Sequence, residues 1–244
     1  MKKAYFLGLF VIISLWSIAS LLINNDILIP YPWVVLTYMS EQILTLSFYI
    51  TLKATILRLL NGVIISLIIA LILGILAIRF KWFHNLFAPI EILLKAIPNM
   101  TYIIMAIIWL GKEKSATLVI VLVIFPILYK NIEYGLTIHN QDLREVLLIY
   151  PEKFSQVLSK ILLPQLLPQL AVGLKSVVGL GFKVCVMAEI IAFTNLGIGR
   201  YLYLAMINLN MTMLFAYSIW VILIAFSFDT LFELLINKLQ KKYN

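Results

Sequence analysis

No charged residue interrupts the stretch Leu59–Ile78, whose sequence is LLNGVIISLIIALILGILAI. A run of about 20 apolar residues is long enough for an α-helix to cross the hydrocarbon core of a bilayer. The whole chain of 244 residues has a similar character, since 63% of its residues are hydrophobic and only 12% are charged. Soluble domains are about 45–50% apolar and about 25% charged. The sequence therefore predicts a membrane protein rather than a soluble globule.

Five further apolar stretches accompany this one. They are Ala4–Ile23, Leu86–Leu110, Ser115–Tyr134, Leu170–Phe193 and Thr212–Ile236. Six spans leave connections too short for a separate soluble domain, so we expect a single transmembrane domain, residues 1–244. The predicted fold is all-α and polytopic, with about six transmembrane helices. A signal peptide is the alternative for the first stretch, but the run is longer than the usual h-region of about 7–15 residues.

The region between the first two spans is expected to lie at the membrane surface. Asn24–Ser40 contains Pro30, Pro32 and Trp33, which are typical of an interfacial loop. The next stretch, Glu41–Asn61, is apolar except for a polar stripe whose spacing keeps its members on one helical face. The members of this stripe are Ser47, Thr51, Thr55 and Arg58. We therefore expect an interfacial helix that leads into the membrane.

The net charge of +8 could reflect nucleic-acid binding, anionic lipid or membrane topology. If both termini are cytoplasmic, eleven of the 19 Lys and Arg residues lie inside, five lie outside, and three lie within spans. This excess of basic residues inside obeys the positive-inside rule and explains the charge without a nucleic-acid partner. The sequence thus predicts a multi-pass protein of the cell membrane, with both termini and residues 135–169 in the cytoplasm.

The sequence offers no catalytic or metal-binding arrangement. Cys185 is the only cysteine, which excludes a disulfide within the chain and a cysteine-based metal cluster. His84 and His139 have neither metal-ligand spacing nor a nucleophile–base arrangement beside them. A phosphate-binding loop is also missing, because Gly111-Lys112 is followed by Glu113 and position 106 is Ala. We expect no enzyme activity and no bound cofactor in this chain.

The predicted cytoplasmic segment, residues 135–169, suggests two short helices joined by a sharp turn. Tyr150 precedes a proline and should end the first helix, while Pro151 suits the first position of the second. In the second helix one face is apolar, formed by Phe154, Val157, Leu158 and Ile161. Such a face either packs against the protein's own cytoplasmic edge or docks into a groove of a partner.

The segment resembles the "EAA" loop of binding-protein-dependent ABC importer permeases, whose pattern is Glu-Ala-Ala-x₃-Gly-x₉-Ile-x-Leu-Pro. Glu145 and Ile161-x-Leu163-Pro164 occur at the family's intervals. The two alanines are replaced by Val146 and Leu147, and the glycine is replaced by Pro151.

Other segments resemble the nitrate, sulfonate and taurine branch of these permeases, in the same order along the chain. They are Leu28-Ile29-Pro30-x-Pro32, Thr55–Gly62, Leu93–Pro98, Ile108-Trp109-Leu110-Gly111, Pro168 with Gly173-Leu174-Lys175, Ala188-Glu189, and Leu196-Gly197-x-Gly199. Each is weak alone, but together they cover most of the chain.

The resemblance implies a type I-like ABC importer permease that forms a homodimer in membrane lipid. It also implies two separate ATP-binding subunits, which hold ATP and Mg, and an extracytoplasmic substrate-binding protein. The substrate would be a small nutrient such as nitrate, taurine, an alkanesulfonate or a thiamine-precursor-like compound. Residues about 135–169 would form the coupling loop that docks on the ATPase. The residues expected to take part are Glu145, Pro151, Phe154, Val157, Leu158, Ile161, Leu163 and Pro164.

Five residues inside spans are candidates for a translocation path, namely Asn99, Tyr102, Met105, Lys183 and Glu189. Ionisable groups within spans are costly and usually face a bundle interior or a cavity. Lys183 and Glu189 are about 240° apart around a helix, so they should not pair with each other. Helix packing is the alternative role for all five. An ion-coupled secondary carrier is the alternative function, although it leaves the coupling segment unexplained.

Overall fold

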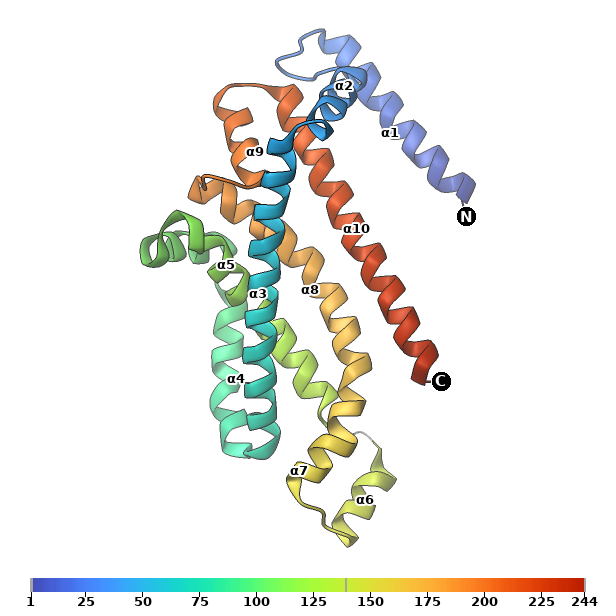
Figure 1. The fold of residues 1–244 in the computed structure, drawn as a ribbon, viewed down its shortest axis with the longest axis vertical. Coiled ribbons are helices and arrows are strands. Elements are labelled where there is room, and N and C mark those ends of the chain that lie inside the picture. Colours follow the sequence, from blue (N-terminus) through green and yellow to red (C-terminus); the bar gives the residue numbers. More distant parts are fainter. Residues whose placement is uncertain (1, 139, 244) are drawn as a thin grey trace.

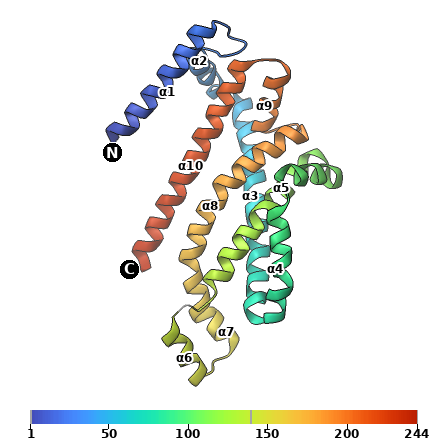
Figure 2. The ribbon, with the colours of Figure 1, turned by 180° about the vertical axis from the view of Figure 1, so that it is seen from behind.

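The computed structural model describes residues 2–138 and 140–243, and side chains are described there except at residues 2–6, 9, 144 and 235–243. Every regular element in these ranges is helical. The helices form an elongated bundle with α6 and α7 at one end and α2 and α9 at the other (Figures 1 and 2). The bounds are α1 Lys2–Ile23, α2 Pro32–Ile43, α3 Leu46–Arg79, α4 Lys81–Ala96, α5 Asn99–Gly135, α6 Gln141–Ile149, α7 Phe154–Val157, a π-helical turn Leu158–Leu162, α8 Leu163–Ala192, α9 Ile198–Ile207 and α10 Met211–Tyr243. The predicted all-α polytopic fold is confirmed.

Four helices among the described residues are long and apolar enough to cross a membrane. They are Leu46–Arg79, Asn99–Gly135, Phe154–Ala192 and Met211–Leu234. The first two contain the second and fourth predicted spans, and the last two contain nearly all of the fifth and sixth. The first predicted span corresponds to α1, of which Phe10–Ile23 is a shorter apolar helix. The third predicted span is divided between α4 and the start of α5.

Two breaks shape the region from α4 to α5. Pro98 separates the two helices, as proline does when it cannot continue a helix. Inside α5, Gly111 has φ of 72° and ψ of −179°, so the chain turns a corner there. This corner lies at the predicted boundary between the third and fourth spans, where the charged residues Lys112, Glu113 and Lys114 follow the glycine. The predicted boundary is confirmed.

Two elements before the corner were predicted wrongly. Pro32 begins α2 instead of lying in a loop, because the fixed φ of proline suits the first turn of a helix. The separate interfacial helix over Glu41–Asn61 is also wrong, because α3 begins at Leu46 and runs unbroken for 34 residues. Its polar stripe faces the bundle rather than the membrane surface, since Thr51 and Thr55 are buried.

The core lies where α3, α5 and α8 pack together. Two glycines allow the close approach of these helices. A Cβ atom on Gly62 would lie 2.5 Å from Ile120 Cγ2, and one on Gly181 would lie 2.4 Å from Ile124 Cδ1. Small residues at helix crossings are typical of membrane bundles, where packing rather than the hydrophobic effect holds helices together.

The loop between α5 and α8 agrees only in part with the prediction. Tyr150 ends α6 with φ of −119° and ψ of 83°, outside the α-helical region, as the following proline predicts. The next helix begins at Phe154 and not at Pro151, because Lys153 is extended, with ψ of 138°. α7 then continues through the π-helical turn into α8. Pro164 is the second residue of α8 and follows the π-helical turn almost directly.

Candidate functional site

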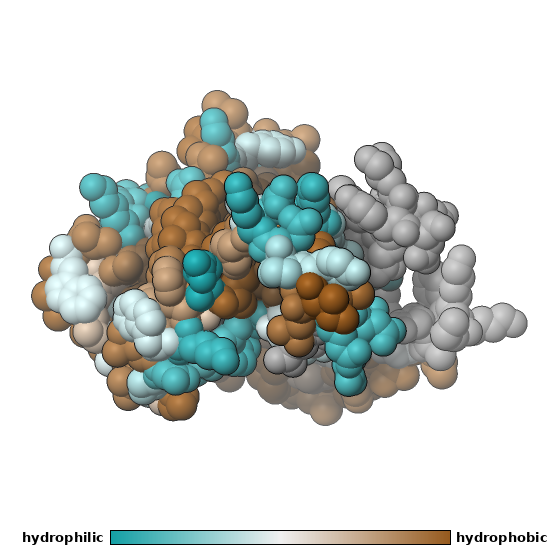
Figure 3. Space-filling model, turned by 90° about the horizontal axis from the view of Figure 1, so that it is seen from below, coloured by the Kyte–Doolittle hydropathy of each residue, from teal (hydrophilic) through white to brown (hydrophobic). Residues whose placement is uncertain are grey.

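The end of the molecule that carries α6 and α7 is the first candidate site. Asn140 caps α6, since its side-chain oxygen accepts a hydrogen bond of 3.1 Å from the N–H of Leu143. The cap fixes where the chain leaves the bundle and makes a separate short helix of residues 141–149. Figure 3 looks onto this end and shows hydrophilic side chains beside apolar ones.

Four apolar or aromatic side chains at the end of α6 form what we call the tip surface. They are Val146, Leu148, Ile149 and Tyr150, which are 51%, 76%, 70% and 72% exposed. They lie between the candidate membrane spans Asn99–Gly135 and Phe154–Ala192, outside both. Exposed apolar patches of this kind mark contacts with other proteins. Their exposure was not predicted from the sequence, although the apolar run directly follows Glu145.

The apolar face predicted for the second helix is turned toward the chain itself. Val157, Leu158 and Ile161 pack against the main hydrophobic core. Phe154 is half-buried, and the guanidinium carbon of Arg79 lies 5.3 Å from the centroid of its ring, which is a cation–π arrangement. Phe154 therefore ties α7 to the end of α3.

The remaining predicted coupling residues are exposed. Glu145 accepts a hydrogen bond of 3.3 Å from Nε2 of Gln141, one turn earlier in α6. Pro151 lies in the turn between α6 and α7, and Leu163 and Pro164 begin α8. The structure therefore leaves Glu145 accessible beside the tip surface.

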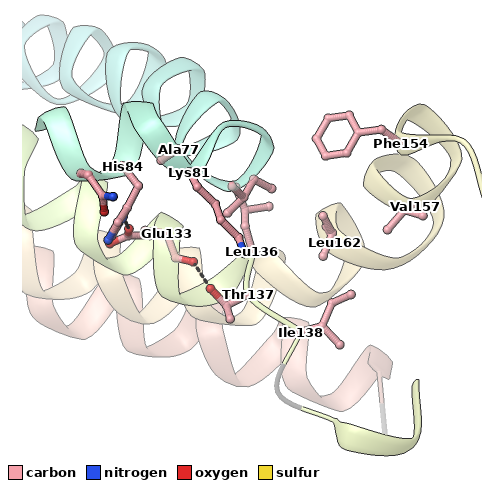
Figure 4. Close-up of a pocket in the computed structure, with 12 residues that line it drawn as sticks. Ala77, Lys81, His84, Glu133, Leu136, Thr137, Ile138, Phe154, Val157 and Leu162 are labelled. Atoms are coloured by element: carbon pink, nitrogen blue, oxygen red, sulfur yellow. Dashed lines mark hydrogen bonds and ion pairs between the residues drawn. The ribbon is translucent and has the colours of Figure 1, made fainter. Parts of the chain in front are cut away.

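A cavity of about 670 Å³ separates α7 from the corner between α3 and α4 (Figure 4). Its lining is mixed, with Leu136 and Leu162 beside charged groups. Nδ1 of His84 contacts Oε1 of Glu133, and Nζ of Lys130 lies 2.8 Å from Oε2 of the same carboxylate. These contacts satisfy Glu133 within the bundle. The cavity interrupts the packing between α7 and this corner, although Val157 still packs against the main hydrophobic core.

The second candidate site lies around Glu189, near the other end of α8. The Glu189 side chain is completely buried, and Oε1 is 2.7 Å from Nη1 of Arg58. Oε2 accepts hydrogen bonds from Oγ1 of Thr55 at 3.0 Å and from the N–H of Gly199 at 2.9 Å. The carboxylate thus joins α3, α8 and α9. We call Thr55, Arg58, Glu113, Glu189 and Gly199 the Glu189 network.

Two glycines leave room for this carboxylate. Gly197 has φ of 132°, a conformation that favours glycine, and a Cβ atom there would lie 2.5 Å from the carboxylate oxygens of Glu189. A Cβ atom on Gly199 would lie 2.5 Å from the carbonyl oxygen of Val186. The Gly-x-Gly pattern of the sequence therefore reflects the space that Glu189 and α8 require.

Arg58 extends the network toward the surface. Its Nη2 lies 2.6 Å from Oε2 of Glu113, and its Nη1 donates a hydrogen bond of 2.6 Å to the carbonyl oxygen of Leu196. The other oxygen of Glu113 accepts a hydrogen bond of 2.7 Å from the N–H of Asn195. The Arg58 side chain is 13% exposed and that of Glu113 is 45% exposed. The network thus fastens the corner after Gly111 and the turn after α8 to α3.

The other predicted path residues are spread over several environments. Tyr102 is buried, and its hydroxyl donates a hydrogen bond of 2.7 Å to the carbonyl oxygen of Leu94, which holds α4 and α5 together at their break. Asn99 and Met105 are half-buried. Lys183 is exposed and does not pair with Glu189, as their angular separation predicted. A path role for these five residues stays a prediction.

Metal chemistry finds no support in the described part of the chain. Residues 2–138 and 140–243 contain no group of three or more His, Cys, Asp and Glu side chains that could hold a metal ion.

Residues 62–241 match the family described as binding-protein-dependent transport system inner membrane component. SsuC of Bacillus subtilis (strain 168), an aliphatic sulfonates transport permease protein, is 28% identical over 191 residues, which cover 78% of this chain and 69% of that protein. The taurine transport system permease protein TauC of Escherichia coli (strain K12) is 26% identical over 195 residues, covering 75% and 69%.

The fold is also similar to a solved structure. A chain of the MetNI methionine ABC transporter in an inward-facing conformation superposes with a TM-score of 0.64 at 16% sequence identity. The superposition covers 79% of this chain and 94% of that chain. At this identity the likeness concerns the fold alone. The family match includes both the α6–α7 loop and Glu189.

Proposed function

The chain belongs to the family of binding-protein-dependent transport system inner membrane components, and from this we propose that it is the permease subunit of an ABC importer. It forms the translocation path for a small nutrient and couples transport to ATP hydrolysis by a separate subunit. The tip surface is the observation that carries the proposal. Its apolar side chains are exposed beyond the spans, directly after Glu145 of the EAA-like pattern.

The continuous helix formed by α7, the π-helical turn and α8 gives this coupling a physical route. It runs from Phe154 to Ala192 over 39 residues. It begins beside the tip surface and ends three residues after Glu189. A displacement of the loop would therefore move α8 against α3 and α9, the helices that the Glu189 network joins to it.

The proposed assembly contains two copies of this chain, two ATP-binding subunits and an extracytoplasmic substrate-binding protein. ATP and Mg bind to the ATPase subunits, and this chain binds no cofactor. The proposed location is the cell membrane, with membrane lipid around the exposed apolar faces of α1 and α10. Both helices have many exposed apolar side chains, among them Leu22 at 81% and Phe226 at 69%.

The proposed substrate is a small nutrient that carries an anionic group, of the kind for which the relatives are named. SsuC is named for aliphatic sulfonates and TauC for taurine. Lys183, which lies within a span and is exposed, supports an anion. A thiamine-precursor-like compound is the second candidate, which rests on the sequence resemblance alone.

Affinity purification from membranes of the cells that produce the chain tests the assembly. We expect an ATP-binding subunit to co-purify in equal amount with the tagged chain. An ion-coupled secondary carrier would instead be isolated without an ATPase and would transport its substrate on an ion gradient alone. That result would refute the proposal.

The orientation of the chain gives the first prediction. In a Cys185→Ala background, Gln141→Cys should react with an impermeant thiol reagent only from the cytoplasmic side, and Asn195→Cys only from the outer side. Both positions are exposed. Inside-out and right-side-out vesicles provide the two measurements. Labelling of both cysteines from one side would contradict the orientation, while Cys185→Ala alone should remain unlabelled from either side.

A further inference from the structure

Lys183 is the one exposed side chain between Val177 and Ala192 of α8. Its neighbours Phe182, Val184 and Cys185 are all buried. Among the described residues, no ion pair or hydrogen bond of its ammonium group is found. A charge inside a span is too costly to face lipid unsatisfied, so such a group normally faces water or a binding site.

An opposite charge approaches the same part of α8. Asp229 of α10 places Oδ1 3.4 Å from the position that a Cβ atom of Gly179 would occupy. Gly179 lies one helical turn before Lys183, about 6 Å along the axis. Side chains of a helix lean toward its N-terminus, which directs Lys183 back toward Gly179. Asp229 thus lies beside the bare backbone of Gly179, and the Lys183 side chain is directed toward the same place.

α8 and α10 lie side by side (Figures 1 and 2). Two further contacts show how the two helices are aligned. The rings of Phe182 and Phe228 lie 5.7 Å apart, and Nζ of Lys175 lies 3.2 Å from Oε2 of Glu233. Lys175 therefore has an ion-pair partner in Glu233. The structure records no ion pair between Lys183 and Asp229.

We propose that Lys183, Gly179 and Asp229 form a subsite in the translocation path for a small zwitterion. The sulfonate or carboxylate of the ligand binds Lys183, and its ammonium group binds Asp229. A simple anion would gain the contact with Lys183 but would also meet the repulsion of Asp229, and a simple cation would have the reverse problem. The subsite rests on the proposed permease function and narrows its substrate class.

Direct binding to the permease–ATPase complex in lipid nanodiscs, without the substrate-binding protein, tests the subsite. The ligands are taurine and ethanesulfonate, which differ by the amino group of taurine. We expect the wild-type complex to bind taurine at least about 10-fold more tightly, because the ammonium group adds a charged hydrogen bond. Equal affinities, or no binding of taurine, would overturn the proposal without the use of any variant.

Single substitutions measure the contribution of each charge to ligand binding. Asp229→Asn should lower the affinity for taurine about 10-fold and change the affinity for ethanesulfonate little. Lys183→Gln should lower the affinity for both ligands. Lys175→Gln is the matched control, and it should change neither affinity by more than about twofold. Unchanged taurine affinity in Asp229→Asn and Lys183→Gln would overturn the subsite. Co-purification of the ATPase is measured on the same samples, and its absence in the wild type would count against the permease function instead.

Discussion

Glu189→Gln should lower the thermal stability of the purified protein far more than Glu113→Gln. Both acids bind Arg58, but Glu189 is completely buried and the Glu113 side chain is 45% exposed. Removal of one partner from a buried ion pair commonly costs about 3–5 kcal/mol, because the other charge stays buried. Exposed pairs contribute about 0–1 kcal/mol. The same carboxylate also accepts hydrogen bonds from Thr55 and Gly199, which increases the expected loss.

The single cysteine supplies the measurement. Cys185 is buried in the folded protein, so a fluorogenic thiol reagent reports its exposure during a temperature ramp. Glu113→Gln is the matched control because it removes a carboxylate from the same arginine. Equal unfolding temperatures for the two variants would contradict a stabilising role of the buried ion pair. If Glu189→Gln kept its stability but lost transport, the predicted role of Glu189 in the path or its gating would be supported instead.

Ile149→Asp should weaken association with the ATPase by about 30-fold or more while leaving the stability of the permease unchanged. Ile149 is 70% exposed on the tip surface, so the substitution disturbs no internal packing. Loss of an apolar anchor at an interface commonly costs about 2 kcal/mol or more, which is about 30-fold in affinity. Ser155→Asp adds the same charge on the exposed polar side of α7 and should bind the ATPase normally.

Two further variants distinguish the parts of the loop. Phe154→Ala should also weaken association with the ATPase, but indirectly, because it removes the contact with Arg79 that holds α7 in place. Glu145→Lys should uncouple hydrolysis from transport even when the complex forms, since Glu145 is exposed beside the tip surface. Retention of ATPase on beads and substrate-stimulated hydrolysis measure the two effects. Wild-type values in Ile149→Asp would show that the tip surface is not the docking site.

The spans were predictable because apolar length is a local property of the sequence. The corner at Gly111 was also visible, since three charged residues follow it. The role of Thr55 and Arg58 could not be predicted from the sequence. Their spacing correctly placed them on one face of a helix, but their partner Glu189 is 131 residues beyond Arg58 in the chain. A polar stripe that meets a distant acid inside the bundle has the same local pattern as a stripe at the membrane surface.

The structure of the coupling loop could likewise be predicted only in part. The apolar spacing of Phe154, Val157 and Ile161 correctly identified an apolar face, but spacing does not reveal whether a face packs inward or remains free. The π-helical turn Leu158–Leu162 carries this face onto the core. Such turns have no simple sequence signal. The exposed run after Glu145 became informative only once the position of α7 was known.

ATP-driven uptake into proteoliposomes tests the central claim most directly. The chain is reconstituted with its co-purified ATPase, and the substrate-binding protein and radiolabelled taurine are added outside while ATP is enclosed inside. We predict uptake that requires ATP, the ATPase subunit and the binding protein, and that continues when ionophores remove all ion gradients. Uptake by the chain alone on an ion gradient, with no effect of ATP or ATPase, would contradict the importer function.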